Sequence, residues 1–266
     1  YVTPGQKVIF KSKSNKLQAF KDIPVNTISL WRKNIMVFEE TPLSEVVATI
    51  NRNYNVAIEV KNKDITDSIN YAKNIQHAML PVESRMKSVM QDHFVLFRPK
   101  DIVSGDFYWF VEKDNKVFLA VVDCTGHGVP GAFMSMIGSA ILTHVVVEQN
   151  ITRPDLILNE MHKKVRTSLK QAETNNNDGM DLSLIVIDKK NNQLEFAGAM
   201  NPLYRFKNGE IETIKGDKTA IGGSQKEEER IFSLHTFELN GDTTIYLSTD
   251  GFADQFGGPK DKKYSF

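Results

Sequence analysis

The sequence predicts an α+β fold in which two antiparallel sheets form a sandwich with helices packed outside. The first observation is a series of short β-prone segments separated by turns that are rich in Asn, Asp and Gly. The second is a pair of long helical patterns, at residues 132–149 and 154–172, that interrupts this series. Runs of strands broken by a helix pair are typical of sheets that carry helices on their outer faces.

The composition is that of an ordinary globular protein, with 41% hydrophobic and 25% charged residues among 266. The formal net charge is zero and no basic stripe is interleaved with aromatic residues, so nucleic acid is not an expected partner. The lone Cys124 excludes an intrachain disulfide and favours a reducing compartment. No apolar run approaches the ~18 residues of a membrane span, and no signal peptide is visible. Since the chain starts at Tyr1 and stops at Phe266, it reads as a fragment, and neither absence describes a parent protein.

Residues 1–62 are predicted to form a small β-α-β module. Segments 2–10 and 35–38 are β-prone, the Thr-Pro pair at 41–42 begins a helix, and segment 56–60 is the last predicted strand. Nothing in this module looks catalytic, so we interpret it as an interaction module.

A linker helix is predicted next, within residues 63–81. Asp64 can cap it, Pro81 ends it, and it covers residues 64–80. This helix either pairs with a second copy in a dimer or packs on its own domain, and the pattern does not decide between the two. Its predicted apolar face consists of Ile65, Ile69, Ala72, Ile75, Ala78 and Met79.

The larger domain, residues 82–266, contains the strands of the predicted sandwich. Asp114-Asn115, Lys190 to Asn192 and Asn208-Gly209 are turn sequences that join neighbouring strands as hairpins. The methionines of the first long helix fit core packing better than a cofactor site. The predicted strands are residues 102–110, 117–122, 181–187, 193–199, 203–207, 211–214, 231–239 and 244–248.

Three of these strands carry an aspartate at or near a turn. Asp123 ends an apolar run and precedes a Gly-rich turn, Asp106 follows Ser-Gly, and Asp250 stands before Gly251 at the end of another strand. Carboxylates gathered from separate strands would repel one another without a cation, and oxygen ligands suit Mg²⁺ and Mn²⁺. No Cys/His spacing favours zinc or iron. The Asp123 stretch alone is also compatible with an ordinary strand-turn-helix corner that has a capping Asp.

Four motifs in order resemble those of the metal-dependent (type 2C-like, PPM) serine/threonine protein phosphatases. The similarity spans residues 64–266 and is greatest to the bacterial branch that includes the sporulation stage II E phosphatase and the phosphatases of stress-response partner switching. It implies a four-layer α-β-β-α sandwich. The motifs are Ser104-Gly-Asp106-Phe-Tyr, Val122-Asp123-Cys-Thr-Gly-His-Gly-Val-Pro-Gly-Ala132, Gly198-Ala-Met-Asn-Pro-Leu203 and Ser248-Thr-Asp250-Gly-Phe252.

The resemblance implies a metal site in which Asp106, Asp123, Asp250 and the backbone carbonyl of Cys124 hold two Mn²⁺ or Mg²⁺ ions. A metal-activated water would attack phosphoserine or phosphothreonine directly, so no Cys124 nucleophile is needed. His127, in the Gly-His-Gly turn, is a candidate substrate contact with a structural role as the alternative. Asp181 and Asp254 are interpreted as supporting or structural residues.

The resemblance also implies a partner and a compartment. The expected substrate is an anti-anti-sigma-like protein that bears phosphoserine, a homodimer through residues 64–80 is possible, and the phosphatase part is expected to be cytoplasmic. The family usually has a further Asp near its C-terminus, and neither Asp188 nor Asp261 is a convincing substitute. We therefore expect one metal site to lack a ligand and this chain to be weakly active or inactive.

Residues 1–62 resemble the C-terminal domain of FecR-type anti-sigma regulators. That domain is periplasmic, and the sequence does not reconcile its compartment with a cytoplasmic phosphatase, so native fusion of the module stays open. The matching residues are Pro4-Gly5-Gln6, Trp31, Phe38, Thr41-Pro-Leu43 and Arg52-Asn-Tyr54.

Two other function classes compete with the enzyme. A catalytically inactive pseudo-phosphatase or scaffold would bind a phosphoprotein or partner without hydrolysing it. A nucleotidyl cyclase or polymerase would also use a two-metal carboxylate site, but no Gly-rich phosphate loop of the P-loop type is present.

Overall fold

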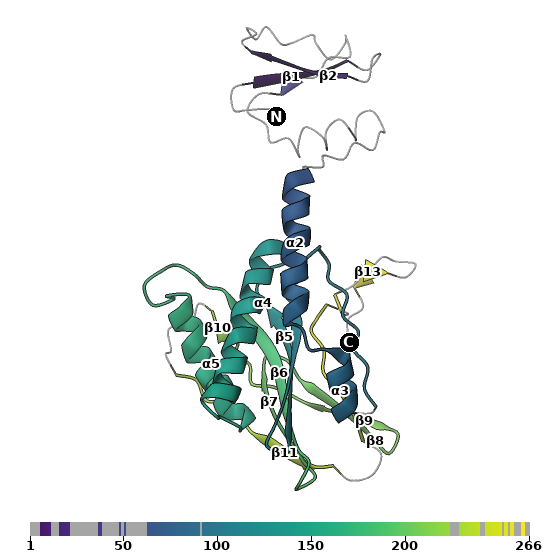
Figure 1. The fold of residues 1–266 in the computed structure, drawn as a ribbon, viewed down its shortest axis with the longest axis vertical. Helices are drawn as coiled ribbons and strands as arrows, with labels where there is room; N and C mark the ends of the chain where they lie inside the picture. Colours follow the sequence, from purple (N-terminus) through teal and green to yellow (C-terminus); the bar gives the residue numbers. More distant parts are fainter. Residues whose placement is uncertain are drawn as a thin grey trace. The chain divides into compact units, whose positions relative to one another are not determined.

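The computed structural model describes residues 6–11, 16–21, 37–38, 48, 51, 63–90, 92–223, 229–239, 243–251, 253–254, 256–257 and 262–263. The chain divides into two compact units, Tyr1–Thr66 and Asp67–Phe266. Figure 1 labels many of the helices and strands of the two units.

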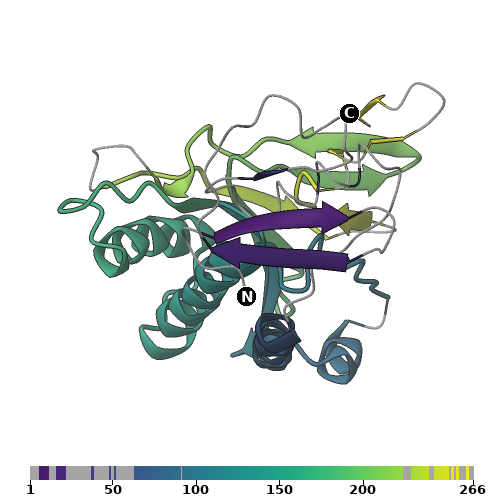
Figure 2. The ribbon, with the colours of Figure 1, turned by 90° about the horizontal axis from the view of Figure 1, so that it is seen from above.

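The described part of the first unit is an antiparallel sheet in the order β2-β1-β3. Its strands are β1 (Gln6–Lys11), β2 (Lys16–Lys21) and β3 (Val37–Phe38). Figure 2 shows β1 and β2 side by side and running in opposite directions. The sequence pattern did not predict β2, while the predicted helix after residues 41–42 and the strand at 56–60 lie outside the described residues.

The second unit is built on an antiparallel sheet in the order β11-β7-β6-β5-β4, with β10 paired to β6. The β4–β5 hairpin turns at Asp114 and Asn115, whose φ angles of 51° and 62° belong to the type of turn that matches strand twist. The strands are β4 (Phe107–Lys113), β5 (Lys116–Cys124), β6 (Gly179–Asp188), β7 (Gln193–Ala199), β10 (Ile221–Gly222) and β11 (His235–Glu238).

Two long helices cover one face of this sheet. They are α4 (Gly128–Thr143), which continues as the π-helix η2 (His144–Glu148), and α5 (Pro154–Ser168). Phe118, Ala120 and Val122 alternate along β5 and are fully buried in the cluster that contains helix residues such as Leu142 and Met161. The run Gly128–Glu148 is long and apolar enough to cross a membrane, but half of its apolar window is buried against the fold, as in a core helix.

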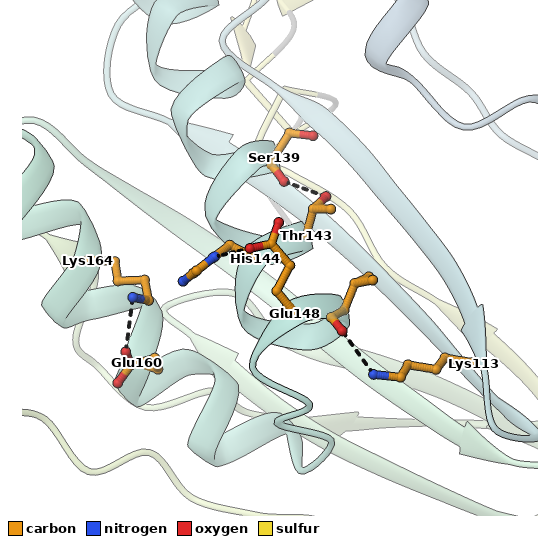
Figure 3. A network of polar contacts seen from close by, with 8 residues as sticks. Lys113, Ser139, Thr143, His144, Glu148, Glu160 and Lys164 are labelled. Carbon is orange, nitrogen blue, oxygen red and sulfur yellow. Dashed lines mark hydrogen bonds and ion pairs between the residues drawn. The ribbon is translucent and has the colours of Figure 1, made fainter.

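The end of the α4–η2 helix is tied to β4 by polar contacts (Figure 3). Lys113 Nζ donates hydrogen bonds to the carbonyl oxygens of Val146 and Val147, at 3.2 and 3.1 Å. Trp109 Nε1 donates to Thr143 Oγ1 at 3.0 Å. The two Lys113 bonds satisfy carbonyls at a helix end, where intrahelical partners run out.

The opposite face of the main sheet packs on a second antiparallel sheet, in the order β12-β8-β9. Phe196 of β7 and Leu203 of β8 are fully buried between the two sheets. The predicted α+β sandwich of two antiparallel sheets is therefore confirmed, and three of the four expected layers lie within the described residues. The second sheet consists of β8 (Leu203–Lys207), β9 (Glu210–Ile214) and β12 (Thr243–Tyr246), and β13 (Phe256–Gly257) pairs separately with β14 (Lys262–Lys263).

Two helices precede β4. The sequence pattern did not predict α3 (Glu83–Val89), which packs Met86 against Phe110 and Val117 on the same face as the second sheet. The linker helix α2 (Lys63–Met79) has nearly the predicted bounds. Ile75 and Met79 of its predicted apolar face are 44% and 36% exposed, so this face is largely uncovered in the second unit and the predicted dimer stays a prediction.

Candidate metal centre

Asp106, Asp123 and Asp181 lie in a row across three neighbouring strands. Asp106 directly precedes β4, whose first residue Phe107 pairs with Val122, so Asp106 lies opposite Asp123. Asp123 pairs with Asp181 of β6. Because Val122 faces the helices and side chains alternate along a strand, Asp123 faces the second sheet.

Asp250 reaches this row from the second sheet. It follows β12 by four residues, and its neighbour Thr249 donates a hydrogen bond from Oγ1 to Oδ2 of Asp106 at 2.8 Å. The backbone N–H of Asp254 donates to the carbonyl of Asp250 at 2.8 Å, which closes the turn behind it. One end of each sheet therefore contributes a carboxylate to the same place.

The pKa shifts of these carboxyl groups indicate that they lie close enough to interact. Burial raises the pKa of Asp123 to about 8, with further increases from the charges of Asp106 and Asp250 and from hydrogen bonds in which Asp123 holds the proton. Burial also raises the pKa of Asp106, although hydrogen bonds from Thr249 and Asp123 oppose this shift. The pKa of Asp181 rises to about 6 through burial and the charge of Asp250.

The residues present fit a hard divalent cation. Among the described groups that shift the pKa of Asp123, all are carboxyl groups and none is a Lys or Arg. Such an uncompensated cluster of oxygen ligands is stabilised when Mg²⁺ or Mn²⁺ binds. Within the described ranges, no group of three His, Cys, Asp or Glu side chains is arranged as a complete set of ligands for one ion.

The backbone carbonyl of Cys124 lies beside the Asp106 loop. A Cβ atom added to Gly105 would stand 3.3 Å from this carbonyl oxygen, which places it next to the loop that carries Asp106. The thiol itself is buried, and burial raises its pKa well above the ordinary value, with nearby carboxylates adding to the shift. A protonated, buried thiol is a poor nucleophile, in agreement with the sequence interpretation.

Glycines allow the loops of the site to touch through their backbones. Gly126 has φ of +84°, a conformation that L side chains rarely adopt. A Cβ atom on Gly105 or on Gly131 would lie only 2.5 Å from the Gly126 carbonyl oxygen, which is closer than van der Waals contact allows. The Gly-rich motif is therefore required by close packing of the Asp106 loop, the turn after Asp123 and the start of α4.

His127 lies at the edge of the site. It precedes α4 at the N-cap position, and its Nδ1 is 2.6 Å from Oδ2 of Asp101, with the imidazole largely exposed. His127 is not among the groups that shift the pKa of Asp123. The described polar contact of His127 is therefore with Asp101 and not with the carboxylate cluster.

Sequence reasoning missed Asp101 and Thr249. Thr249 directly precedes Asp250, so its place in the motif was visible but its partner was not. Asp101 had no signal, because its contact with His127 spans 26 residues. Of the residues considered as substitute ligands, Asp188 accepts hydrogen bonds in a surface turn at the other end of β6, and Asp261 lies outside the described residues.

Comparison with known families supports the assignment made from the motifs. The model of stage II sporulation protein E (SpoIIE) matches residues 113–265, more than half of the chain. This chain belongs to the SpoIIE family. A second model, the C-terminal domain of FecR, matches residues 35–76. No curated protein matches the chain significantly.

One solved structure with more than 30% sequence identity agrees with this membership. The SiaA-PP2C domain of Pseudomonas aeruginosa has 37% sequence identity and a TM-score of 0.67, over 77% of this chain and 79% of its own. SpoIIE from Bacillus subtilis, solved as its PP2C phosphatase domain with a fragment of the regulatory domain, has 17% identity and a TM-score of 0.46, over 60% of this chain and 44% of its own. RsbX, solved in complex with magnesium, has 18% identity and a TM-score of 0.41, over 56% of this chain and 68% of its own. The match to the SiaA-PP2C domain shows that the SpoIIE-family chain described here has a PP2C-type phosphatase fold.

Proposed function

We propose that this SpoIIE-family chain hydrolyses phosphoserine or phosphothreonine on a regulatory protein. The observation that carries the proposal is the convergence of Asp106 and Asp123, from one hairpin, with Asp250 from the distant second sheet, with the pKa of Asp123 raised to about 8. A cluster that resists ionisation by itself is suited to cations that neutralise it. Asp106, Asp123, Asp250 and the carbonyl of Cys124 would hold two Mn²⁺ or Mg²⁺ ions.

When bound, these cations supply the positive charge that stabilises phosphoryl oxygens and lowers the pKa of water at the site. The chain prepares the site in three ways. Asp123 would be ionised with the cations present, its proton lost to solvent, Thr249 fixes the orientation of Asp106, and the Gly126 turn excludes side chains from the space between the loops. These contributions are consistent with preorganisation of the ligands.

Substrate binding is assigned to the surface around the start of α4. This helix has no side-chain N-cap bond and no acidic residue in its first turn, so its N-terminal amides favour an anion. His127 is exposed beside it, as are Val129 (40%) and Phe133 (63%). We propose that a phosphorylated, anti-anti-sigma-like protein binds here and that the reaction takes place in the cytoplasm.

The test is hydrolysis of p-nitrophenyl phosphate with and without Mn²⁺. We expect Mn²⁺-dependent turnover in the wild type and its loss in Asp123→Asn by at least ~100-fold, in line with the loss of a group that stabilises the transition state. Asp188→Asn is the matched control, because Asp188 is a half-buried residue at the far end of β6 and its substitution should leave turnover unchanged.

Two results would contradict the proposed phosphatase activity. Turnover that does not depend on Mn²⁺, or that survives Asp123→Asn, would remove the carboxylate cluster from the reaction. A folded wild type that binds Mn²⁺ and a phosphoserine peptide but shows no turnover would favour the pseudo-phosphatase or scaffold.

A further inference from the structure

Gln76 is an unusual residue of α2. Among the described side chains of this helix it alone is buried, with 5% of its surface exposed, although a side-chain amide is strongly polar. A buried amide is costly unless hydrogen bonds satisfy it. The partners of Gln76 therefore indicate what holds this residue in place.

The Gln76 amide binds both backbone groups of a single residue. Its Nε2 donates to the carbonyl oxygen of Ser104 at 2.6 Å, and its Oε1 accepts from the backbone N–H of Ser104 at 3.0 Å. Nε2 also donates to Oγ of Ser135 in α4 at 2.8 Å. Ser135 Oγ in turn donates to the carbonyl of Ala132, so the network ends on the backbone of α4.

Ser104 stands two residues before Asp106, in the loop that leads to β4. This loop is held at three consecutive positions: Gln76 binds Ser104, Gly105 packs against the Gly126 carbonyl, and Thr249 binds the carboxylate of Asp106. Two of these contacts come from the site already described. The third comes from α2, which contributes no carboxylate to it.

We propose that Gln76 is a positioning residue of the metal centre, which fixes the Ser104–Asp106 loop so that Asp106 lies against Asp123 before a cation binds. The inference rests on the proposed function. Gln76 acts through the loop backbone and touches neither the carboxylates nor a substrate. Without it, the loop must be ordered at the moment of binding, which weakens cation affinity.

The experiment compares wild type, Gln76→Met, Asn74→Ala and Ser135→Ala. Met matches Gln in length and apolar packing but makes no hydrogen bonds to Ser104. Asn74→Ala is the matched control on an exposed position of α2, and Ser135→Ala removes a bond to α4 while the two bonds to Ser104 remain. The measurements are Mn²⁺ affinity by calorimetry and hydrogen exchange of the Ser104 amide by NMR, both on the complete chain.

We expect Gln76→Met to bind Mn²⁺ about tenfold more weakly, as outer-shell substitutions do, and its Ser104 amide to exchange at least tenfold faster in the metal-free protein. Asn74→Ala and Ser135→Ala should bind Mn²⁺ as the wild type does. A residue that only stabilised the fold would change the melting temperature without changing Mn²⁺ affinity or local exchange at Ser104.

Each other result overturns the inference in a distinguishable way. Wild type that binds Mn²⁺ together with Gln76→Met that binds it equally tightly would refute the positioning role and leave the proposed function intact. Wild type that binds no Mn²⁺ would refute both. If Gln76→Met fails to fold, Gln76→Asn replaces it, since its shorter amide cannot hold both groups of Ser104. Unfolding of both variants would show that Gln76 serves the fold as a whole.

Discussion

At the residue scale, Asp123 has the most strongly raised pKa among the carboxyl groups of the described metal centre. Its pKa is raised from 3.8 to about 8 by burial and by Asp106 and Asp250. The unfolded chain therefore releases this proton near pH 4, while the folded metal-free chain keeps it until about pH 8. Below about pH 4 the raised pKa of Asp123 therefore does not change the free energy of unfolding. Between about pH 4 and pH 8 it lowers this free energy as the pH rises.

The raised pKa of Asp123 predicts that Asp123→Asn stabilises the metal-free protein. In EDTA, the variant should melt above the wild type by roughly 2–4 °C for each ~1 kcal/mol of relieved repulsion in a domain of this size, and the difference should grow between pH 5 and pH 8. In Mn²⁺ the order should reverse, because only the wild type gains binding energy. Thermal melting by circular dichroism at the two pH values measures both effects.

A lower melting temperature for Asp123→Asn in EDTA at pH 8 would contradict this interpretation of the cluster. Asp188→Asn is again the suitable comparison. Its carboxylate accepts hydrogen bonds from Asn191 and Lys190, which lower its pKa, so its replacement should not stabilise the protein at any pH.

The sequence pointed to these aspartates because each stands within or at the end of a β-prone run, at or near a turn, which is a local pattern. It did not identify the residues that hold them. Thr249 meets Asp106 across 143 residues, and Gln76 meets Ser104 across 28. A side-chain contact over such separations depends on the tertiary fold, and a Gln on a polar helix has no periodicity that distinguishes it from a solvated residue.

At the element scale, the start of α4 is set by glycines rather than by a capping side chain. The sequence pattern predicted this helix from residue 132, because Gly128, Pro130 and Gly131 are turn-forming residues, whereas the helix begins at Gly128. Packing against the Asp106 loop overrides this local preference, since Gly131 lies against the Gly126 carbonyl and Gly105. The short α3 was missed for a similar reason, because Val82 at its N-cap makes no side-chain bond.

Two alanine substitutions in α4 should therefore differ. In Gly131→Ala the new Cβ would stand 2.5 Å from a backbone oxygen and 2.9 Å from Gly105 Cα, so the loops must separate. We expect a loss of about 1–3 kcal/mol, typical of overpacking, and weaker Mn²⁺ binding. In Gly138→Ala the new Cβ would meet only side-chain ends of Phe107 and Met180, at 3.0 and 3.1 Å.

Gly138→Ala should change stability by less than ~1 kcal/mol, since the better helix propensity of Ala offsets a small side-chain adjustment. Urea unfolding of both variants and calorimetry with Mn²⁺ provide the comparison. Equal Mn²⁺ affinity in Gly131→Ala and wild type would show that backbone contact between the loops does not shape the metal centre.

At the scale of the whole molecule, the sandwich was predictable because its strands and hairpin turns are marked locally by alternation and by Asn, Asp and Gly. The turns at Asn115, Asn192 and Asn208 all have positive φ, as such sequences require. The order of the strands and the meeting of the two sheets at one site came from the structure. Both depend on pairing between distant segments, which no local pattern encodes.

The central claim is that the two sheets bring Asp106, Asp123 and Asp250 around shared divalent cations. The direct measurement is the anomalous scattering of Mn²⁺ in crystals of this chain grown with the metal. We predict peaks roughly 2.0–2.6 Å from oxygens of all three carboxylates, the distance range of hard cations, and their absence in Asp123→Asn. Crystals soaked in Mn²⁺ whose peaks lie elsewhere, with the three carboxylates free of metal, would contradict the claim.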